Sequence, residues 1–258
     1  MKISKLFDTL LLVVIILLFS CDCKTNRYSN IIKNIFKMQN NIIYNGQNVI
    51  DVSSGKQFDI NNYFKILENI ELEKNYKLGY YYIDVKNKPS YGMPIIIPYT
   101  TSDSLKEQID KIENTINVPI FLKKDTTIFD PQYFLKHIEI KKTDGYFDFI
   151  IIYIMGNQFG LKGMSISSKI QIIYDRNGLE NIYKFIKNKN GLLFSLSINP
   201  VPKVVEYEKE IMVDLILFSR WKGLYEMKYF ISKSFPHKII RMHERMILEY
   251  NHGVIYLL

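Results

Sequence analysis

The feature that most constrains this chain is an unbroken run of ten apolar residues near its start, at positions 10–19. Lys2 and Lys5 precede the run against a single Asp8, and the small residue Ser20 follows it. A basic start, a short apolar core and a small residue at the end are typical of a secretory signal peptide. A membrane-spanning helix needs about 20 apolar residues, so this run is too short to be one. We therefore expect residues 1–20 to be a signal peptide outside the folded body.

The sequence Leu18-Phe19-Ser20-Cys21 resembles the lipobox of bacterial lipoproteins. The resemblance implies that the Cys21 thiol carries a diacylglyceryl group, that the signal peptide is cut just before it, and that acyl chains such as palmitate anchor the protein. It also implies a place on the cell membrane or outer membrane, facing the periplasm or the exterior. Each buried methylene contributes about 0.8 kcal/mol, so several chains on one cysteine make a lasting tether. Residues 21–30 would then be the lipid-anchored tether.

The chain has one further cysteine, Cys23, which lies two residues after Cys21. Once Cys21 is acylated, Cys23 has no partner with which to form a structural disulfide. We therefore expect the fold to be held by its core alone. The chain of 258 residues is 47% hydrophobic, so residues 31–258 can form one large domain, with a sub-boundary only near Gly191.

The formal charge of +8 is compatible with nucleic acid or an anionic membrane surface as a partner. The chain contains no alanine and is rich in Ile, Asn, Lys and Tyr, a bias expected of an AT-rich genome. Lysine is then partly a codon effect, and the basic residues are interleaved with acids rather than clustered. We therefore expect no nucleic-acid partner. The predicted partners are the membrane, through Cys21, and an envelope protein or glycan.

The pattern of apolar residues predicts an α+β fold around a mainly antiparallel sheet, with a largely β C-terminal part. Helices are expected at 29–44, 59–70, 101–117, 130–137 and 179–189. Strands are expected at 49–52, 77–85, 93–99, 146–155, 161–174 and 192–198. In the first of these helices Lys33 and Lys37 fall on the face opposite the apolar one, and Ser29 is its expected N-cap. Ser104 and Glu107 have the spacing of a capping box.

From position 203 onward the sequence indicates strands only. Residues 211–220 and 225–232 fit a hairpin that turns at Lys222-Gly223. Both faces are apolar, so the hairpin should be central in the sheet. The register we expect groups Met212, Ile216, Phe218, Met227, Tyr229 and Ile231 on one face, and Val213, Leu215, Leu217 and Phe230 on the other. Residues 238–250 fit either a strand or a helix, and we favour a strand.

No local motif assigns a catalytic, cofactor-binding or metal-ligating residue. His237, His243 and His252 would need to converge with Glu244 or Glu249 to hold a metal, and their spacing is unlike that of known sites. Ser-x-x-Lys occurs twice, at Ser53 and at Ser219, neither time opening a predicted helix. Gly156, Gly160 and Gly163 lack the dinucleotide-binding spacing. Glu206, Glu208 and Glu210 are more simply a solvated strand edge. The tyrosines at positions 80–82 could line a glycan- or peptide-binding surface.

These observations favour a membrane-anchored, exported protein that binds rather than catalyses. Two other classes stay open. One is an envelope hydrolase with a carboxylate site assembled from distant residues, which leaves little local trace in a sequence. The other is an immunity-type or chaperone lipoprotein that acts on a partner protein. A cavity with converging carboxylates would favour the hydrolase, and a flat apolar surface would favour protein binding.

Overall fold

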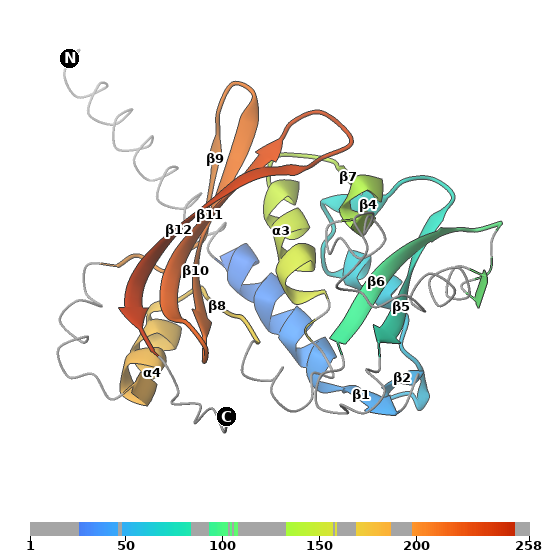
Figure 1. Ribbon diagram of the computed structural model, residues 1–258, viewed down its shortest axis with the longest axis horizontal. Helices are drawn as coiled ribbons and strands as arrows, with labels where there is room; N and C mark the ends of the chain where they lie inside the picture. Colours follow the sequence, from blue (N-terminus) through green and yellow to red (C-terminus); the bar gives the residue numbers. More distant parts are fainter. Residues whose placement is uncertain are drawn as a thin grey trace, which may run out of the picture.

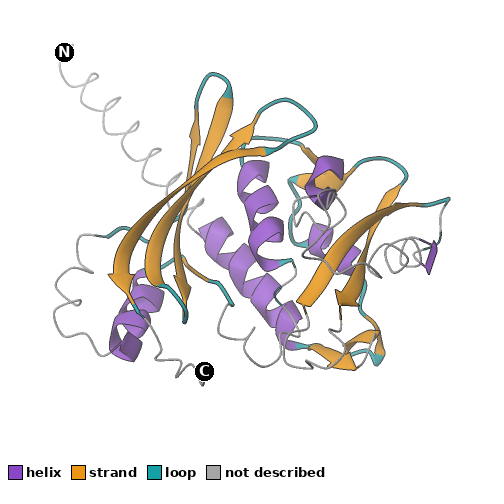
Figure 2. Ribbon diagram, in the orientation of Figure 1, coloured by secondary structure: helices purple, strands orange, loops and turns teal. Residues whose placement is uncertain are grey.

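The computed structural model describes residues 26–45, 48–83, 93–102, 104, 106–107, 133–156, 158, 169–186 and 198–250. Over these residues the protein has an α+β fold with antiparallel sheets, as predicted. Figure 1 shows two central helices, with a large C-terminal sheet on one side and smaller sheets on the other. Figure 2 shows the same layers by type of secondary structure.

The large sheet has the strand order β12-β11-β10-β8, with β9 also paired to β10. Its strands are β8 (Gln171–Ile173), β9 (Lys203–Glu206), β10 (Glu210–Ser219), β11 (Gly223–Ser232) and β12 (Ile239–Glu249). The all-β C-terminal part and the choice of a strand for residues 238–250 are therefore confirmed. The β10–β11 hairpin is central, because β12 lies on one side of it and β8 and β9 on the other.

The predicted register of the hairpin was wrong by one residue. Leu215 pairs with Met227 and Leu217 with Tyr225, so the odd-numbered residues of both strands share a face. That face packs in the main core against the helix α3 (Gly145–Met155). The other face carries Ile216, Phe218 and Leu224, which pack under the helix α4 (Arg176–Ile186). Placing the turn one residue off moves every side chain of β11 to the opposite face.

The stretch at 146–155, expected to be a strand, is the helix α3. Ten of its eleven residues are buried, because the large sheet covers one side and β4 (Ile70–Leu72) and β7 (Ile138–Ile140) cover another. A helix buried all round has no amphipathic period. Its apolar, β-branched composition therefore looks like that of a buried strand.

The first described helix covers residues 26–40, not 29–44. Ser29, the expected N-cap, lies inside it, and Ile42 and Ile43 belong to β1 (Ile42–Asn45). Residues 26–30, which we placed in the tether, are its first turns, and Tyr28 is buried. In Figure 1 this helix, in blue, lies beside α3. Among the helices that the structure describes, none is long and apolar enough to span a membrane.

The smaller sheets hold the remaining strands. They are β1 with β2 (Asn48–Asp51) and β3 (Lys56–Gln57), β4 with β7, and β5 (Tyr76–Ile83) with β6 (Met93–Thr100). The helix predicted at 59–70 is a short 3₁₀ helix, η1 (Ile60–Lys65), capped by Asp59 as expected. A second, η4 (Tyr133–His137), ends the predicted 130–137 helix. Both hydrogen bonds of the Ser104–Glu107 capping box are present.

Several predicted features lie outside the described residues. They are the rest of the 101–117 helix, the strand at 192–198, most of the strand at 161–174 and the sub-boundary near Gly191. The helix predicted at 179–189 is confirmed in α4, which begins three residues earlier than expected.

Candidate functional site

A cavity of about 590 Å³ lies between the first helix and the end of the large sheet formed by β8 and the last residues of β10. We call it the basic cavity. Its lining residues come from four places in the chain: Ile32, Lys33, Phe36, Lys37, Gln39, Asn40 and Asn41 from the first helix and its end; Met155 and Gln158 from the end of α3; Lys169, Ile170, Gln171, Ile172 and Tyr174 around β8; and Phe218 and Arg220 from the end of β10. Its volume falls within the range, about 300–1,000 Å³, of small-molecule sites.

The first helix gives the cavity an apolar side and a cationic side. An α-helix turns about 100° per residue. Going round the helix, the lining residues follow in the order Gln39, Ile32, Phe36, Asn40, Lys33 and Lys37. Gln39 and Ile32 are buried, while Lys33 and Lys37 are exposed. Phe36, between them, is 44% exposed although it is a large apolar side chain. Over less than half a turn, the helix surface therefore changes from the buried Gln39 and Ile32 to the exposed Lys33 and Lys37. We call the exposed, positively charged side of the cavity its cationic rim.

Among the described residues, the lining includes four cations, Lys33, Lys37, Lys169 and Arg220, and no carboxylate. None of the four forms an ion pair within the described part of the chain. Three of them lie over aromatic rings. The Lys169 Nζ is 5.0 Å from the centre of the Phe36 ring, the Lys33 Nζ 5.7 Å from that of Tyr174, and the Arg220 Cζ 5.7 Å from that of Phe185. Desolvation lowers the pKa of Lys169. Burying an unpaired charge is unfavourable, so an anion bound here would relieve that cost.

Two of these cations emerge at the same end of the sheet. Phe218 pairs with Gln171 where the β10–β8 ladder ends. Arg220 and Lys169 each lie two residues beyond that pair on their own segments, so the antiparallel register directs both to this end.

The floor of the cavity contains a buried amide, that of Gln39. Its Nε2 donates to the Tyr63 hydroxyl at 2.8 Å and to the Met155 carbonyl. The Met155 carbonyl can only accept, which fixes the amide orientation. Gln39 Oε1 is buried and has no hydrogen-bond partner among the described residues. The Tyr80 hydroxyl donates to the carbonyl of Gly156, the residue after Met155, at 2.7 Å. The hydroxyls of Tyr63 and Tyr80 therefore lie next to the Gln39 amide and the end of α3. Desolvation raises the pKa of Tyr63 to about 12 and that of Tyr80 well above its ordinary value, which keeps both neutral.

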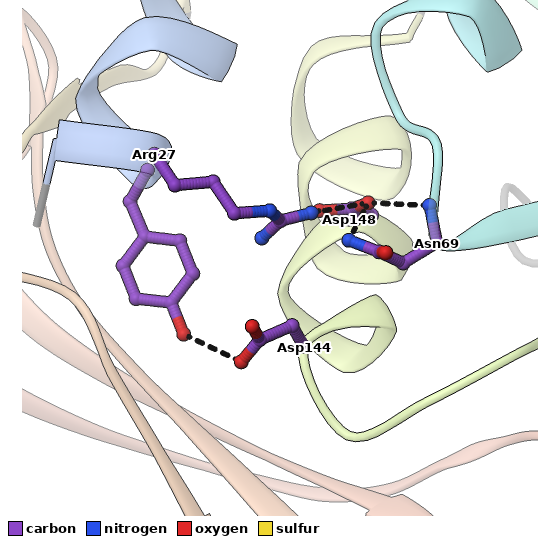
Figure 3. Close-up of polar contacts among 5 residues, drawn as sticks. Arg27, Asn69, Asp144 and Asp148 are labelled. Carbon is purple, nitrogen blue, oxygen red and sulfur yellow. Dashed lines mark hydrogen bonds and ion pairs between the residues drawn. The ribbon is translucent and has the colours of Figure 1, made fainter. Parts of the chain in front are cut away.

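The wall formed by the first helix is fixed to α3 by a buried ion pair (Figure 3). The Arg27 guanidinium donates to both oxygens of Asp148, at 2.7 and 2.8 Å. The backbone N–H and side-chain amide of Asn69 donate to the same carboxylate, each at 3.1 Å. The Asp148 side chain is fully buried, and desolvation raises its pKa although Arg27 opposes the shift. The Tyr28 hydroxyl donates to Asp144 at 3.4 Å, beside this pair.

The histidines singled out from the sequence do not lie together. His237 is buried, its Nδ1 is 3.0 Å from the Ser232 carbonyl oxygen, and its ring packs edge-on against Tyr146 and Phe149. His243 is exposed on β12, and His252 lies outside the described residues. Within the described ranges, no three His, Cys, Asp or Glu residues are grouped so as to hold a metal ion.

The other sequence candidates have structural contacts. Ser53 donates to Asp51 within a turn, and Ser219 ends β10. Glu206 pairs with Lys233, Glu210 with Arg241, and Glu244 with Lys222. Glu208 lies in the exposed turn before β10, and Glu249 ends β12. Tyr80 is the member of the 80–82 cluster whose side chain is described. It is partly buried against the main core, and its hydroxyl donates to the Gly156 carbonyl.

One pair of carboxylates lies on the outer face of the large sheet. Asp214 pairs with Lys228 and Ile216 with Glu226, so the two acids are diagonal neighbours. Desolvation, with Glu226 adding to it, raises the pKa of Asp214, and a hydrogen bond from Arg245 lowers that of Glu226. Divergent pKa shifts of this kind occur in acid–base pairs. Here Arg245 and Lys228 both pair with Glu226, so a surface ion-pair network accounts for the lowered pKa of Glu226, and burial accounts for the raised pKa of Asp214.

No protein-family model, curated protein or solved structure matches this chain. The residues that line the cavity are therefore the guide to what it binds. The sequence had shown only part of it, since Lys33 and Lys37 were visible as the polar face of a helix. Lys169, Arg220 and Gln39 belong to no motif, and only the fold brings them to one cavity.

Proposed function

We propose that the mature protein is anchored to the bacterial cell envelope through a lipid on Cys21 and binds an anionic ligand in the basic cavity without catalysing a reaction on it. The observation that carries the binding proposal is a cavity lined by four cations, none with a carboxylate partner in the described chain. Lys169 is half-buried, and a cation withdrawn from water usually has a partner. Lys33, Lys37 and Arg220 are exposed. Cations left unpaired around a cavity are suited to a ligand that supplies the negative charge.

The lining also argues for binding rather than hydrolysis. Its described residues include amides, cations and apolar groups, and none of them is Asp, Glu, His, Ser or Cys. Glycoside hydrolysis needs two carboxyl groups facing the bond to be cut, and acyl transfer needs an activated nucleophile. The Asp214–Glu226 pair, with its divergent pKa shifts, lies outside the cavity lining, and Glu226 is already paired with Arg245.

The protein-binding alternative has one feature in its favour, on β12. Ile240, Met242 and Met246 are 56, 53 and 42% exposed. Arg241 and Arg245 lie on the opposite face of the same strand, where they pair with Glu210 and Glu226. Charged residues spaced along an edge strand usually prevent pairing with other chains. We therefore place protein binding second.

The anchoring proposal predicts that Cys21 is the lipidated first residue of the mature protein. Cells fed a fatty-acid analogue should label the wild-type protein, and Cys21→Ala should lose the label and keep its signal peptide. Cys23→Ala is the matched control, because Cys23 is the other thiol and lies two residues away. Label that remains on Cys21→Ala, or that is lost from Cys23→Ala, would contradict the anchor.

The binding proposal predicts that an anionic fluorescent dye, anilinonaphthalene sulfonate, binds through the cavity cations. We expect a quadruple variant, Lys33, Lys37, Lys169 and Arg220 to Gln, to weaken dye binding at least about tenfold, which is ~1.4 kcal/mol. The control variant changes Lys141, Lys222, Lys233 and Arg241 to Gln. It removes the same total charge from ion pairs outside the cavity lining.

Both variants are measured as the anchored chain in phosphatidylcholine vesicles, with empty vesicles as the blank. The dye should bind the control variant within about twofold of the wild type. An equal loss in the two variants would show that only the overall positive charge attracts the dye, and the cavity would lose its assigned role.

A further inference from the structure

We infer that the ligand of the basic cavity is a single-chain anionic amphiphile, with a carboxylate or phosphate headgroup on the cationic rim and an acyl chain along the apolar side. This inference rests on the proposed function, since it names the ligand class for the same cavity. Fatty acids and lysophospholipids share this chemistry.

The first argument is the separation of polarity across the cavity. Ile32, Met155 and Ile172 are buried in the main core on its apolar side, and Phe218 adds a buried ring from the α4 face of β10. A small anion such as phosphate would satisfy the rim and leave these apolar walls facing water. A cavity of about 590 Å³ is also far larger than phosphate needs. A ligand that is anionic at one end and apolar along its length meets both conditions.

The second argument is Phe36. This ring is 44% exposed, yet it lies between the buried Ile32 and the rim lysines and has the Lys169 ammonium 5.0 Å from its centre. An exposed aromatic side chain at the boundary of a polar and an apolar wall is suited to contact the first carbons below a charged headgroup. Lys169 would then pair with the headgroup itself, and its unfavourable desolvation would be offset.

The third argument is the distance from the proposed anchor. Five residue steps separate Cys21 from Asn26, the first residue of the described helix. Five extended residues span at most about 18 Å, so this helix cannot lie far from a membrane that holds Cys21. Its residues 32–40 form one wall of the cavity. The cavity is therefore within reach of lipids that leave, or enter, that membrane.

The experiment uses the anchored full chain in phosphatidylcholine vesicles and photoreactive twelve-carbon probes that carry a diazirine. One probe ends in a carboxylate, one in a phosphate and one in a hydroxyl. The amount of each probe attached to peptides that line the cavity is measured by mass spectrometry. We expect the two anionic probes to label these peptides at least tenfold more than the hydroxyl probe. Unlabelled dodecanoate should compete, and inorganic phosphate at the same concentration should not.

The outcomes separate this inference from the proposed function. If inorganic phosphate competes as well as dodecanoate, the site holds small anions, and the amphiphile inference fails while anion binding stands. If the hydroxyl probe labels equally, the headgroup charge has no role and both proposals fail. No labelling of the cavity by any probe, with the sulfonate dye still bound through the four cations, overturns the amphiphile alone.

A matched pair of variants tests the acyl contact. Phe36→Ser should reduce cavity labelling by the anionic probes at least fivefold. Phe235→Ser changes a phenylalanine of similar exposure, 46% against 44%, that does not line the cavity, and should leave labelling unchanged. Because both rings are exposed, neither change is expected to unfold the chain. Equal labelling of Phe36→Ser and the wild type would overturn the assigned position of the chain.

The source of the amphiphile is settled by where the probe starts. In one arm the probes are added from solution, and in the other they are incorporated in the vesicles beforehand. Labelling only in the second arm assigns a membrane lipid as the source, and labelling in the first arm at low probe concentration assigns a free fatty acid or lysophospholipid. The absence of labelling in both arms contradicts the inference.

Discussion

Replacing Arg27 with methionine should lower the free energy of unfolding by about 3 kcal/mol. Removing one partner of a buried ion pair typically costs about 3–5 kcal/mol, because the other charge stays buried without compensation. The lower end applies here, since the Arg27 side chain is 27% exposed and Asn69 still donates two hydrogen bonds to Asp148. Methionine keeps the apolar stem of the side chain, so the loss reports on the charge. Urea unfolding at neutral pH measures it.

Lys141→Met is the matched control. Lys141 pairs with Glu71 at the same 2.7 Å, but both side chains are about half exposed. Exposed pairs contribute about 0–1 kcal/mol, so this variant should lose at most that amount. In the double variant Arg27→Met with Asp148→Leu, much of the lost stability should return, because an apolar pair leaves no buried charge. A double variant that is less stable than Arg27→Met alone would contradict this account.

The pH dependence of Arg27→Met has a definite sign. Desolvation raises the pKa of Asp148 and Arg27 opposes that rise, so removing Arg27 raises the pKa further. A carboxyl whose pKa is higher in the folded state than in the unfolded state destabilises the fold above the folded pKa. That penalty disappears as the pH falls towards about 3.9, the ordinary value of aspartate. The stability lost in Arg27→Met should therefore shrink with acidification, whereas the Lys141→Met difference should change little.

The C-terminal sheet could be predicted from the sequence because its signals are local. The Lys222-Gly223 turn and the alternation on either side of it indicate a hairpin whatever lies elsewhere in the chain. The register could not be predicted as securely, because moving the turn by one residue leaves both faces apolar. Only packing decides between the two registers: the face with Leu215 lies under α3, and the face with Phe218 lies under α4.

The helix α3 shows why burial obscures secondary structure. Its residues 146–155 contain one charged residue, Asp148, and five isoleucine or methionine residues from position 150 onward. A strand in the middle of a sheet has the same composition, and periodicity cannot separate the two when every side is covered. The useful signal was Asp148 itself. A lone acid in an apolar run must be paired when buried, and its partner, Arg27, lies 121 residues away.

The candidate site could not be predicted for the same reason. Lys33 and Lys37 were correctly placed on one helix face, but a lysine pair on a helix usually lies in solvent. The cavity arises because β8 and the end of β10 bring Lys169 and Arg220 to that face. These residues are separated by more than 130 positions from Lys33 and carry no motif. Long-range strand pairing, which no local pattern records, assembles the site.

Gly223→Ala should destabilise the protein by about 2–5 kcal/mol. Gly223 opens β11 with φ +105, a region that residues with a side chain rarely adopt. Such backbone strain costs about 1–3 kcal/mol. A Cβ on Gly223 would lie 2.2 Å from the Leu248 carbonyl oxygen and 2.5 Å from the Tyr250 backbone nitrogen. These are backbone atoms at the end of β12, so no side chain can rotate to make room. Overpacking of this kind adds about 1–3 kcal/mol.

Gly55→Ala is the control that separates the two causes. Gly55 also has a positive φ, +66, but nothing lies within 4 Å of the position its Cβ would take. It should therefore lose only the strain of a left-handed residue, about 1–2 kcal/mol. Urea unfolding of the two variants gives the difference directly. If Gly223→Ala lowers the free energy of unfolding no more than Gly55→Ala does, the close approach of β12 to the turn does not contribute to the loss of stability. A larger loss, of the size expected, means that β11 and β12 pack at Gly223 only because no side chain stands between them.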